Sequence, residues 1–395
     1  MVMVLLFLLA FIIRIIVAAN TFGTWDMESV YIVADMLKKD IPVYLATWRY
    51  NQPPVWMWTI GGMSYLSDIT NIPLSFWARI PFIFTDTGIG ILIYKIAKWK
   101  KYQEKTAKIL SALYLFSPIA IWVSSYQAQL DSAIIFLIIL AGWILVRSEK
   151  ITTHKLIISG LILGFSSTIK LVPLSMAPIF SWYLLKKMLV KKVPVLKIVI
   201  SLTVFNLLLV IPLILVFLPY LDQWAGIRAD VVGYKTAWGI WGTSLLLRRL
   251  VELVPGQIIT DVVEFSKQQG LIVASILALS YLFVLIKRMS LFGMIFTLFF
   301  VVTLVSPFLA PQYLLWLLPF WLIEKAKPTL FIIYNLLSFS SLFLLFAEWQ
   351  DPQFFVYLGN ILGINDRILS INSFTLFSLS AWMILFFVIK AKRKT

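Results

Sequence analysis

The chain has 395 residues, of which 61% are hydrophobic and 13% charged, and it carries a formal net charge of +16. A soluble globular domain is roughly 45–50% apolar and about 25% charged, so this composition excludes an ordinary soluble enzyme and a disordered regulator. Cysteine is absent and His154 is the only histidine. Disulfides, thiolate nucleophiles, Cys/His zinc sites and a histidine general base are therefore excluded, and any chemistry must use Asp, Glu, Lys, Arg, Tyr or amide groups.

Hydrophobic segments long enough to enter a bilayer recur along the whole chain. Because a spanning helix needs roughly 17–25 residues, the sequence predicts an all-α polytopic membrane protein with about twelve transmembrane helices. These are expected at residues 2–19, 72–97, 109–125, 130–146, 156–170, 172–185, 198–218, 271–286, 291–310, 312–323, 328–346 and 373–389. The first segment has no basic residues before it and carries Arg14, so we expect a retained helix rather than a cleaved signal peptide.

The loops between alternate segments are short and basic. They hold 21 Lys and Arg residues against three Glu, which alone exceeds the net charge of the whole chain. The positive-inside rule places these loops and both termini in the cytoplasm and leaves no charge that calls for a nucleic-acid partner. The basic loops are residues 98–108, 147–155, 186–197, 287–288, 324–327 and 390–394.

Three long loops lie on the opposite side, at residues 20–71, 219–270 and 347–372, and they hold most of the acidic residues. We expect one membrane domain spanning residues 1–395, with these loops covering a site on the outer or luminal face. Residues 27–39 and the segment LLLRRLVELV are expected to form amphipathic helices on the outer surface of the membrane.

The first outer loop carries acids in the pattern Asp26-x-Glu28. Two interpretations are open: a helix N-cap with a favourable first-turn acid, worth only about 1 kcal/mol each, or a pair of catalytic carboxylates. Pro53 and Pro54 end any helical pattern, so the preceding polar residues should turn back toward the membrane surface. These candidate substrate-binding residues are Tyr50, Asn51 and Gln52.

Polar residues also occupy the tips between short hydrophobic segments. The stretch SSYQAQLD places Gln127, Gln129 and Asp131 at one tip, where they suit a water-filled cavity, although Asp131 could instead be an N-cap. Lys170 lies at a second tip, where it either snorkels toward water or serves as a cation within a cavity. The flanking segments are short of the hydrocarbon thickness, so this tip should be recessed.

Three further pairs of polar or charged residues are candidates for function. Gln312 and Tyr313 begin a segment of only about 12 apolar residues, which should also be recessed. Arg248 and Arg249 could contact lipid headgroups or a donor phosphate. Arg79 and Asp86 lie on one face of the second span, where helix-packing ion pairs are favoured over function.

Taken together, these residues resemble the GT-C glycosyltransferases, polytopic enzymes that take sugars from polyprenyl-phosphate carriers. The sequence is most similar to the mannosyltransferases of GPI and phosphatidylinositol-mannoside synthesis. The residues and motifs that carry the resemblance are Asp26, Tyr31, Tyr44, Arg49, Tyr50, Pro54, the Gln127–Asp131 tip, Lys170 with Pro173, and Ser306-Pro307 followed by Gln312, Tyr313 and Trp316. These residues are spread over about residues 20–320. Their order along the chain makes the resemblance to this family moderately specific.

The resemblance implies an enzyme that moves a hexose, with mannose favoured, from a polyprenyl or dolichyl phosphate to a glycolipid or glycan acceptor. Asp26 is the candidate base, with Glu28 and Asp131 as further catalytic candidates. Lys170, Arg248 and Arg249 are candidates for the donor phosphate. A carboxylate base and a phosphate leaving group held by cations favour direct displacement with inversion.

Alternatives from other classes remain. A transporter or flippase of lipid-linked sugars would place its charges near the bilayer midplane and show inverted repeats, which this sequence lacks. An O-antigen-type polymerase or ligase would depend on an outer Arg-rich loop. The sequence identifies no cofactor, and a divalent metal, Mg²⁺ or Mn²⁺, could assist. The expected partners are the lipid-linked donor, the acceptor and membrane lipids, with no nucleic acid.

Overall fold

The computed structural model describes residues 2–147, 151–254, 256–325, 327–350 and 353–390. The predicted cytoplasmic residues Lys150, Lys392, Arg393 and Lys394 lie outside the described residues, as do both chain ends. The described residues form helices, turns and loops, with one isolated β-bridge between Trp238 and Phe308 and no strand among them. The prediction of an all-α protein is confirmed.

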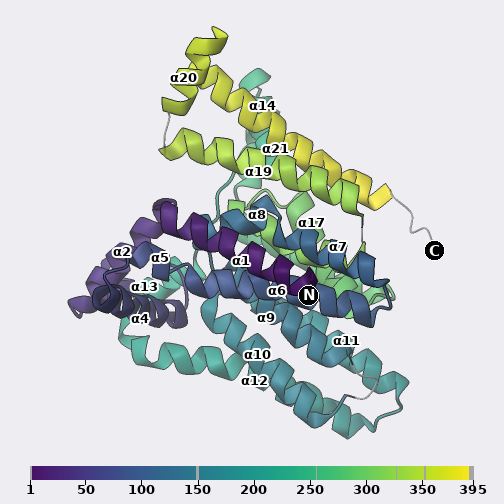
Figure 1. The fold of residues 1–395 in the computed structure, drawn as a ribbon. Coiled ribbons are helices and arrows are strands. Elements are labelled where there is room, and N and C mark those ends of the chain that lie inside the picture. Colours follow the sequence, from purple (N-terminus) through teal and green to yellow (C-terminus); the bar gives the residue numbers. More distant parts are fainter. Residues whose placement is uncertain (1, 148–150, 255, 326, 351–352, 391–395) are drawn as a thin grey trace. The chain divides into compact units, whose positions relative to one another are not determined.

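The chain divides into two compact units, whose segments can be found in Figure 1 from the residue numbers on its colour bar. The first comprises Met1–Phe116, Ala120–Tyr234 and Lys287–Ile295. The second comprises Ser117–Ile119, Lys235–Ile286 and Phe296–Thr395. The single domain expected from the sequence stays a prediction, and each unit is described by itself.

The first unit is a helical bundle in which α6 packs on α1 and α9, and α10 packs on α9 and α12 (Figure 1). The segment Trp122–Tyr126, a short π-helix, follows a break after α7. The helices are α1 (Val2–Asn20), α2 (Trp25–Lys38), α3 (Val43–Ala46), α4 (Pro54–Thr70), α5 (Leu74–Trp77), α6 (Ile80–Trp99), α7 (Glu104–Leu115), α9 (Asp131–Val146), α10 (Thr153–Ile169), α11 (Ala177–Val190), α12 (Val195–Phe217) and α13 (Trp224–Gly226).

The second unit is built around the antiparallel pair α19 and α21, with α20 packed on α21 and α14 packed on both α15 and α21. The short helix α8 (Pro118–Ile121) and the helix α17 (Leu291–Val305) each have residues in both units. The remaining helices are α14 (Gly242–Leu253), α15 (Gln257–Ser266), α16 (Gln269–Ile286), α18 (Leu314–Glu324), α19 (Pro328–Gln350), α20 (Gln353–Leu362) and α21 (Asp366–Lys390).

The predicted count of twelve spans is not confirmed. By length and composition, six helices among the described residues could cross a membrane, or seven if the bent pair Glu104–Leu115 and Pro118–Tyr126 is one span. Three more, Asp131–Val146, Thr153–Ile169 and Leu291–Val305, are apolar but shorter than a full span. Several predicted hydrophobic segments therefore fold as short helices, in line with the lengths expected from the sequence around the polar tips.

The loop predicted at residues 20–71 contains α4, which the sequence analysis missed. The prediction that Pro54 is not helical is wrong, because α4 begins at Pro54 after an extended Pro53. Proline is tolerated at the first position of a helix, where its missing N–H group would have no partner in any case. The expected amphipathic helices are present as α2 and α14, with α2 burying Met27, Val30 and Val33.

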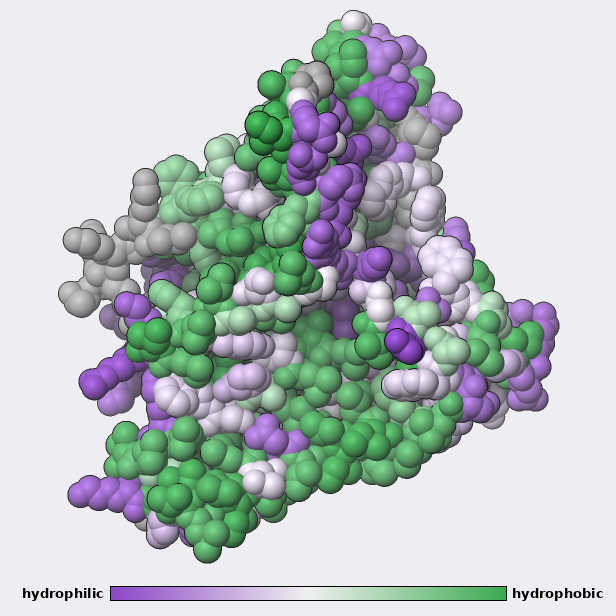
Figure 2. All heavy atoms as spheres, turned by 180° about the vertical axis from the view of Figure 1, so that it is seen from behind, coloured by the Kyte–Doolittle hydropathy of each residue, from purple (hydrophilic) through white to green (hydrophobic). Residues whose placement is uncertain are grey.

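Hydrophobic side chains cover wide areas of the surface on the face shown in Figure 2. In α12, a helix of 23 residues, the buried residues are Ile198, Phe205 and Leu209, while Val199, Leu207 and many others are exposed. Exposed apolar area costs roughly 25 cal/mol per Å² in water, so such a helix is stable where lipid covers it. The chain is a multi-span membrane protein.

Arg14 and Asp86 form a buried ion pair at 2.8 Å between α1 and α6. Asp86 also accepts hydrogen bonds from Tyr114 at 2.5 Å and Ser124 at 3.0 Å. Asp86 thus forms an ion pair that holds two helices together, as the helix-packing interpretation predicted, and its partner is Arg14. Arg79, the residue just before α6, instead donates to backbone carbonyls, as described below.

Two glycines of the first unit provide a test of helix packing. A Cβ added at Gly164 on α10 would lie 2.3 Å from the carbonyl oxygen of Leu208 on α12, whereas a Cβ at Gly62 on α4 would meet no atom within 4 Å. We expect Gly164→Ala to destabilise the protein by about 1–3 kcal/mol through overpacking. Gly62→Ala should be neutral or stabilising by up to about 1 kcal/mol through helix propensity. Thermal unfolding in detergent measures both, and equal midpoints would contradict the packing of α10 on α12.

Candidate active site

Asp26 lies in the first turn of α2, which begins after a tight connection from α1. Gly23 has a φ of +103°, a conformation that favours glycine, and Thr24 is extended before the helix. Thr24 therefore occupies the N-cap position, and Asp26 is free to point away from the helix end. The N-cap interpretation of Asp26 does not describe its position, although a first-turn acid still complements the helix dipole.

Arg79 forms hydrogen bonds both to the connection between α1 and α2 and to the tip after Trp122–Tyr126. Its guanidinium is buried and donates to the carbonyls of Ala18 and Thr21 at 3.0 and 2.9 Å, to that of Phe22, and to that of Tyr126 at 3.0 Å. Carbonyls at the end of a helix lack intrahelical partners, so a buried cation there satisfies several at once. A Cβ at Gly23 would lie 2.5 Å from Nη2 of Arg79, which is why the chain needs glycine at this approach.

The tip that follows Tyr126 brings Gln129 to Asp26. Ala128 has a φ of +58°, a left-handed conformation that costs a non-glycine residue on the order of 1 kcal/mol. Such strain is typical of functional sites, where the surrounding structure enforces it. After this turn, Gln129 Nε2 donates to Asp26 Oδ2 at 2.7 Å, and Thr24 Oγ1 lies 3.3 Å from the same oxygen.

The carboxyl group of Asp26 is crowded by protein atoms, and this incomplete solvation raises its pKa. Hydrogen bonds from Thr24 and Gln129 and the positive charge of Lys170 act in the opposite direction, while the charge of Asp131 raises the pKa further. As a whole residue Asp26 is exposed, so contact with water limits the size of the shift. Asp26 is thus a carboxylate that takes up a proton more readily than an ordinary aspartate.

Lys170 and Asp131 form a buried ion pair beside this group. Lys170 Nζ lies 3.1 and 3.0 Å from the two carboxylate oxygens of Asp131, and the side chains are 9% and 0% exposed. Lys170 does not snorkel to a water interface, and Asp131 binds it rather than capping α9. Because Gln129 is two residues before Asp131, one short segment joins the carboxyl group of Asp26 to the ammonium group of Lys170.

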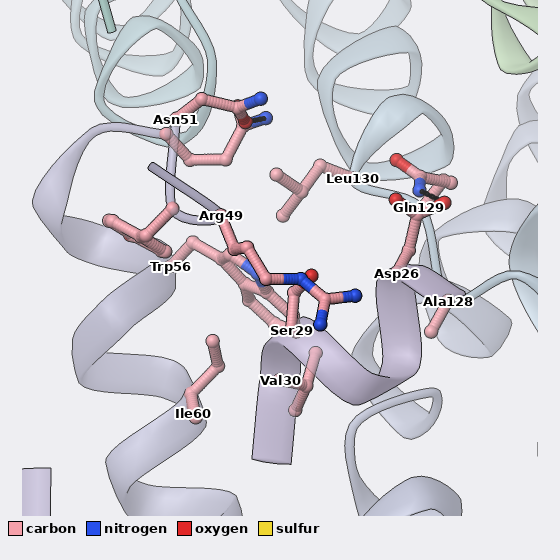
Figure 3. A pocket seen from close by; sticks show the side chains of 12 residues that line it. Asp26, Ser29, Val30, Arg49, Asn51, Trp56, Ile60, Ala128, Gln129 and Leu130 are labelled. Carbon is pink, nitrogen blue, oxygen red and sulfur yellow. Dashed lines mark hydrogen bonds between the residues drawn. The ribbon is translucent and has the colours of Figure 1, made fainter. Parts of the chain in front are cut away.

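A pocket opens next to Asp26, between α2 and the segment before α4 (Figure 3). The sequence-predicted Tyr50, Asn51, Gln52 and Gln129 all line it. Arg49 also lines it, and its guanidinium lies 3.1 Å from Glu28. Gln127 lies at the same tip but is buried, and its amide has no hydrogen-bond partner among the described residues.

The other predicted residues lie in the second unit. Arg249 bonds Glu252 at 2.6 Å and Thr375 at 3.0 Å, and Arg248 lies 3.6 Å from Glu252. Gln312 and Tyr313 lie in a short 3-10 turn before α18, where Tyr313 stacks on Trp316 with ring centroids 3.9 Å apart. Their roles in phosphate and substrate binding stay predictions.

Comparison with protein families gives one match that covers more than half of the chain. Residues 5–235 match the family described as GPI transamidase subunit PIG-U. The chain belongs to the PIG-U family. The matched region contains Asp26, the 122–131 tip and Lys170, and every residue that lines the pocket lies within it.

Among solved structures, the chain is similar to ArnT from Cupriavidus metallidurans in the apo state, with 11% identity, a TM-score of 0.54, and coverage of 98% of this chain and 76% of ArnT. The structure of the same protein bound to undecaprenyl phosphate matches with 12% identity and a TM-score of 0.49 over the same shares. No curated protein matches the sequence. This PIG-U family member therefore has an ArnT-like GT-C fold, as the sequence predicted.

Sequence reasoning did not assign a role to three groups at the site. Arg49 was noted only as part of a family pattern, and Thr24 was not singled out. Tyr234 was also missed; incomplete solvation first, and then the negative charges of Asp26 and Asp131, raise its pKa to about 12. Tyr234 lies more than 100 residues from both carboxylates in the sequence, so only the fold could associate them. Among the described residues, no three carboxylate or histidine groups gather as a metal site, and metal assistance stays a prediction.

The Lys170–Asp131 pair in this PIG-U family member can be tested by a double-mutant cycle. Removing one partner of a buried pair leaves a charge without that compensation and typically costs about 3–5 kcal/mol. We expect Lys170→Met and Asp131→Asn each to lower the thermal unfolding midpoint strongly, and the double variant to recover a large part of the loss. A double variant whose loss equals the sum of the single losses would show that the two groups do not interact.

Proposed function

We propose that this protein transfers a sugar from a polyprenyl-phosphate carrier to a hydroxyl group of a glycan or glycolipid acceptor, with Asp26 as the general base. The observation that carries the proposal is the carboxylate of Asp26, held by Gln129 on the wall of an open polar pocket. The GT-C fold supports a membrane-bound sugar transferase, although a fold alone does not decide a reaction.

The chemistry requires a group that accepts the proton of the acceptor hydroxyl as its oxygen attacks the anomeric carbon. A base works best when its pKa lies near the working pH, so a carboxylate with a raised pKa is better suited than an ordinary one. The carbon–oxygen bond to the carrier phosphate breaks as the new glycosidic bond forms, and the polyprenyl phosphate leaves with the electron pair. One base and direct displacement lead to inversion at the anomeric carbon.

The donor phosphate needs positive charge or backbone donors as its leaving oxygen gains charge. Lys170 is our candidate, and its pairing with Asp131 means that phosphate would compete with a carboxylate for the same ammonium group. The sugar is a hexose, with mannose favoured by the resemblance to mannosyltransferases of glycolipid synthesis. The site faces the outer or luminal side, the termini face the cytoplasm, and a carrier delivered through the bilayer supplies the sugar.

The match to the PIG-U family favours a second candidate function. The family is described as a subunit of GPI transamidase. In that case the chain would act as a part of a larger membrane enzyme, and the pocket would hold a glycan without transferring it. Transfer of labelled sugar from a polyprenyl-phosphate donor by the purified chain alone would distinguish the two, because a subunit without chemistry of its own gives no product.

The first functional prediction concerns Asp26→Asn. An amide keeps an oxygen that accepts the hydrogen bond of Gln129 but cannot take a proton, so we expect sugar transfer to fall at least 100-fold. The stability of the folded protein should not decrease. The raised pKa means that the ionised carboxylate at neutral pH is a cost to the folded state, which disappears below the pKa of the unfolded chain. The thermal midpoint at pH 7 should be equal or higher, and wild-type turnover would refute the assignment of the base.

The second prediction concerns pH. Transfer should be lost as the pH falls through the pKa of Asp26, with a midpoint above the value of about 4 typical of aspartate. Gln129→Leu removes a hydrogen bond that favours the charged form, so the midpoint should move to higher pH. Gln127→Leu is the matched control, since the amide of Gln127 makes no hydrogen bond among the described residues. A midpoint that does not respond to Gln129→Leu would contradict the role of Asp26.

A further inference from the structure

The pocket beside Asp26 is a small cavity. Its volume is about 80 Å³. A cavity of this size can take one edge of a sugar ring and its hydroxyl groups, with the remainder outside. The pocket is half open, which allows the rest of a larger glycan to extend toward solvent.

The lining suits hydroxyl groups. Amide groups of Asn51, Gln52 and Gln129 and the hydroxyl of Ser29 each supply both donors and acceptors, and Asp26 supplies an acceptor. Trp56 and Tyr50 complete the wall with flat aromatic groups, against which the apolar face of a sugar ring can pack. A few oriented polar groups on an aromatic wall are typical of small-molecule sites.

The charges around the pocket determine which sugars it can accept. Arg49 is the cation of the lining, and Figure 3 shows its side chain reaching into the pocket beside Ser29. Its guanidinium is paired with Glu28 at 3.1 Å and also donates to the carbonyl of Trp25 at 3.3 Å. Asp26 lines the pocket and Glu28 pairs with Arg49, so with Asp26 ionised these three groups carry one net negative charge, which a phosphate in the pocket would meet.

We propose that this pocket binds the hydroxyl-bearing edge of an uncharged sugar on the acceptor, and that Glu28 makes it reject a phosphorylated sugar by neutralising Arg49. The assignment to the acceptor rests on the proposed function, because a base must touch the hydroxyl that attacks. Glu28 is then a specificity-determining residue rather than a second base. Selectivity arises because like charges repel the wrong ligand more than they weaken the right one.

Saturation-transfer NMR on the purified full chain tests this without any sugar transfer. The probes are methyl α-D-mannopyranoside and its 6-phosphate. We expect the wild-type protein to bind the neutral sugar at least tenfold more tightly than the phosphate. Glu28→Gln frees Arg49 from its carboxylate and should reduce this preference at least fivefold.

Two variants locate the effect. Asp35→Asn is the matched control, because Asp35 lies on the same helix α2, pairs with Lys39 at 2.8 Å and changes the net charge equally, yet does not line the pocket. It should leave the preference unchanged. Ser29→Trp places an indole in the cavity and should abolish binding of the neutral sugar.

The proposal is overturned if neither sugar binds, if the phosphate binds as tightly as the neutral sugar, if Asp35→Asn acts like Glu28→Gln, or if Ser29→Trp leaves binding intact. Its failure is separable from failure of the proposed function. Binding is measured without a donor, whereas the base is tested by transfer in Asp26→Asn. A chain that shows the charge preference but no transfer would be a glycan-binding subunit with the same pocket.

Discussion

The guanidinium of Arg79 holds together the two segments on which the candidate site depends. One is the connection from α1 to α2, which carries Asp26, and the other is the tip after Tyr126, which carries Gln129. A buried arginine is costly unless its donors are satisfied, and here backbone carbonyls satisfy them. Those carbonyls lie at or just after the ends of α1 and of the Trp122–Tyr126 segment, where intrahelical partners are missing. The same hydrogen bonds therefore satisfy both the buried guanidinium and the buried carbonyls. They also fix the position of Asp26 relative to Gln129.

Two ion pairs balance the charges of Lys170 and Arg49 in the rest of the site. Lys170 faces Asp131 in the interior, and Arg49 faces Glu28 at the rim, so each cation has its own carboxylate. The two pairs differ in their surroundings. The inner pair is nearly fully buried, where loss of one partner is expensive, while the outer pair is partly exposed and contributes little to stability. The outer pair can thus be changed to alter ligand preference, whereas the inner pair is bound up with folding. Asp26 lies between them without a cation of its own at hydrogen-bond distance among the described residues.

The two proposed functions would use the same fold and the same pocket. The first proposed function is sugar transfer from a lipid carrier, and the second is a place as a subunit of a larger membrane enzyme. In both proposals the polar pocket holds a glycan at the membrane. Only transfer needs a carboxylate that accepts a proton, which makes Asp26 the residue that separates the two functions.

The sequence by itself determined the membrane class, the all-helical fold and the identity of the polar residues at the helix tips. The composition and the lengths of the hydrophobic segments decide these features, because backbone groups without hydrogen bonds and isolated charges are costly in lipid. The polar residues Asp26, Gln129, Asp131 and Lys170 could be singled out because the sequence around each of them is mostly apolar.

The pairing of these residues could not be predicted from the sequence. Asp86 was associated with Arg79 by helical spacing, yet its cation is Arg14 on another helix. Contacts across 39 to 103 residues, such as Lys170 with Asp131 and Gln129 with Asp26, depend on how helices pack, and helical periodicity carries no information about them. Only the tertiary structure decided which carboxylate stays without a cation, because that depends on which partners the fold brings within a few ångströms.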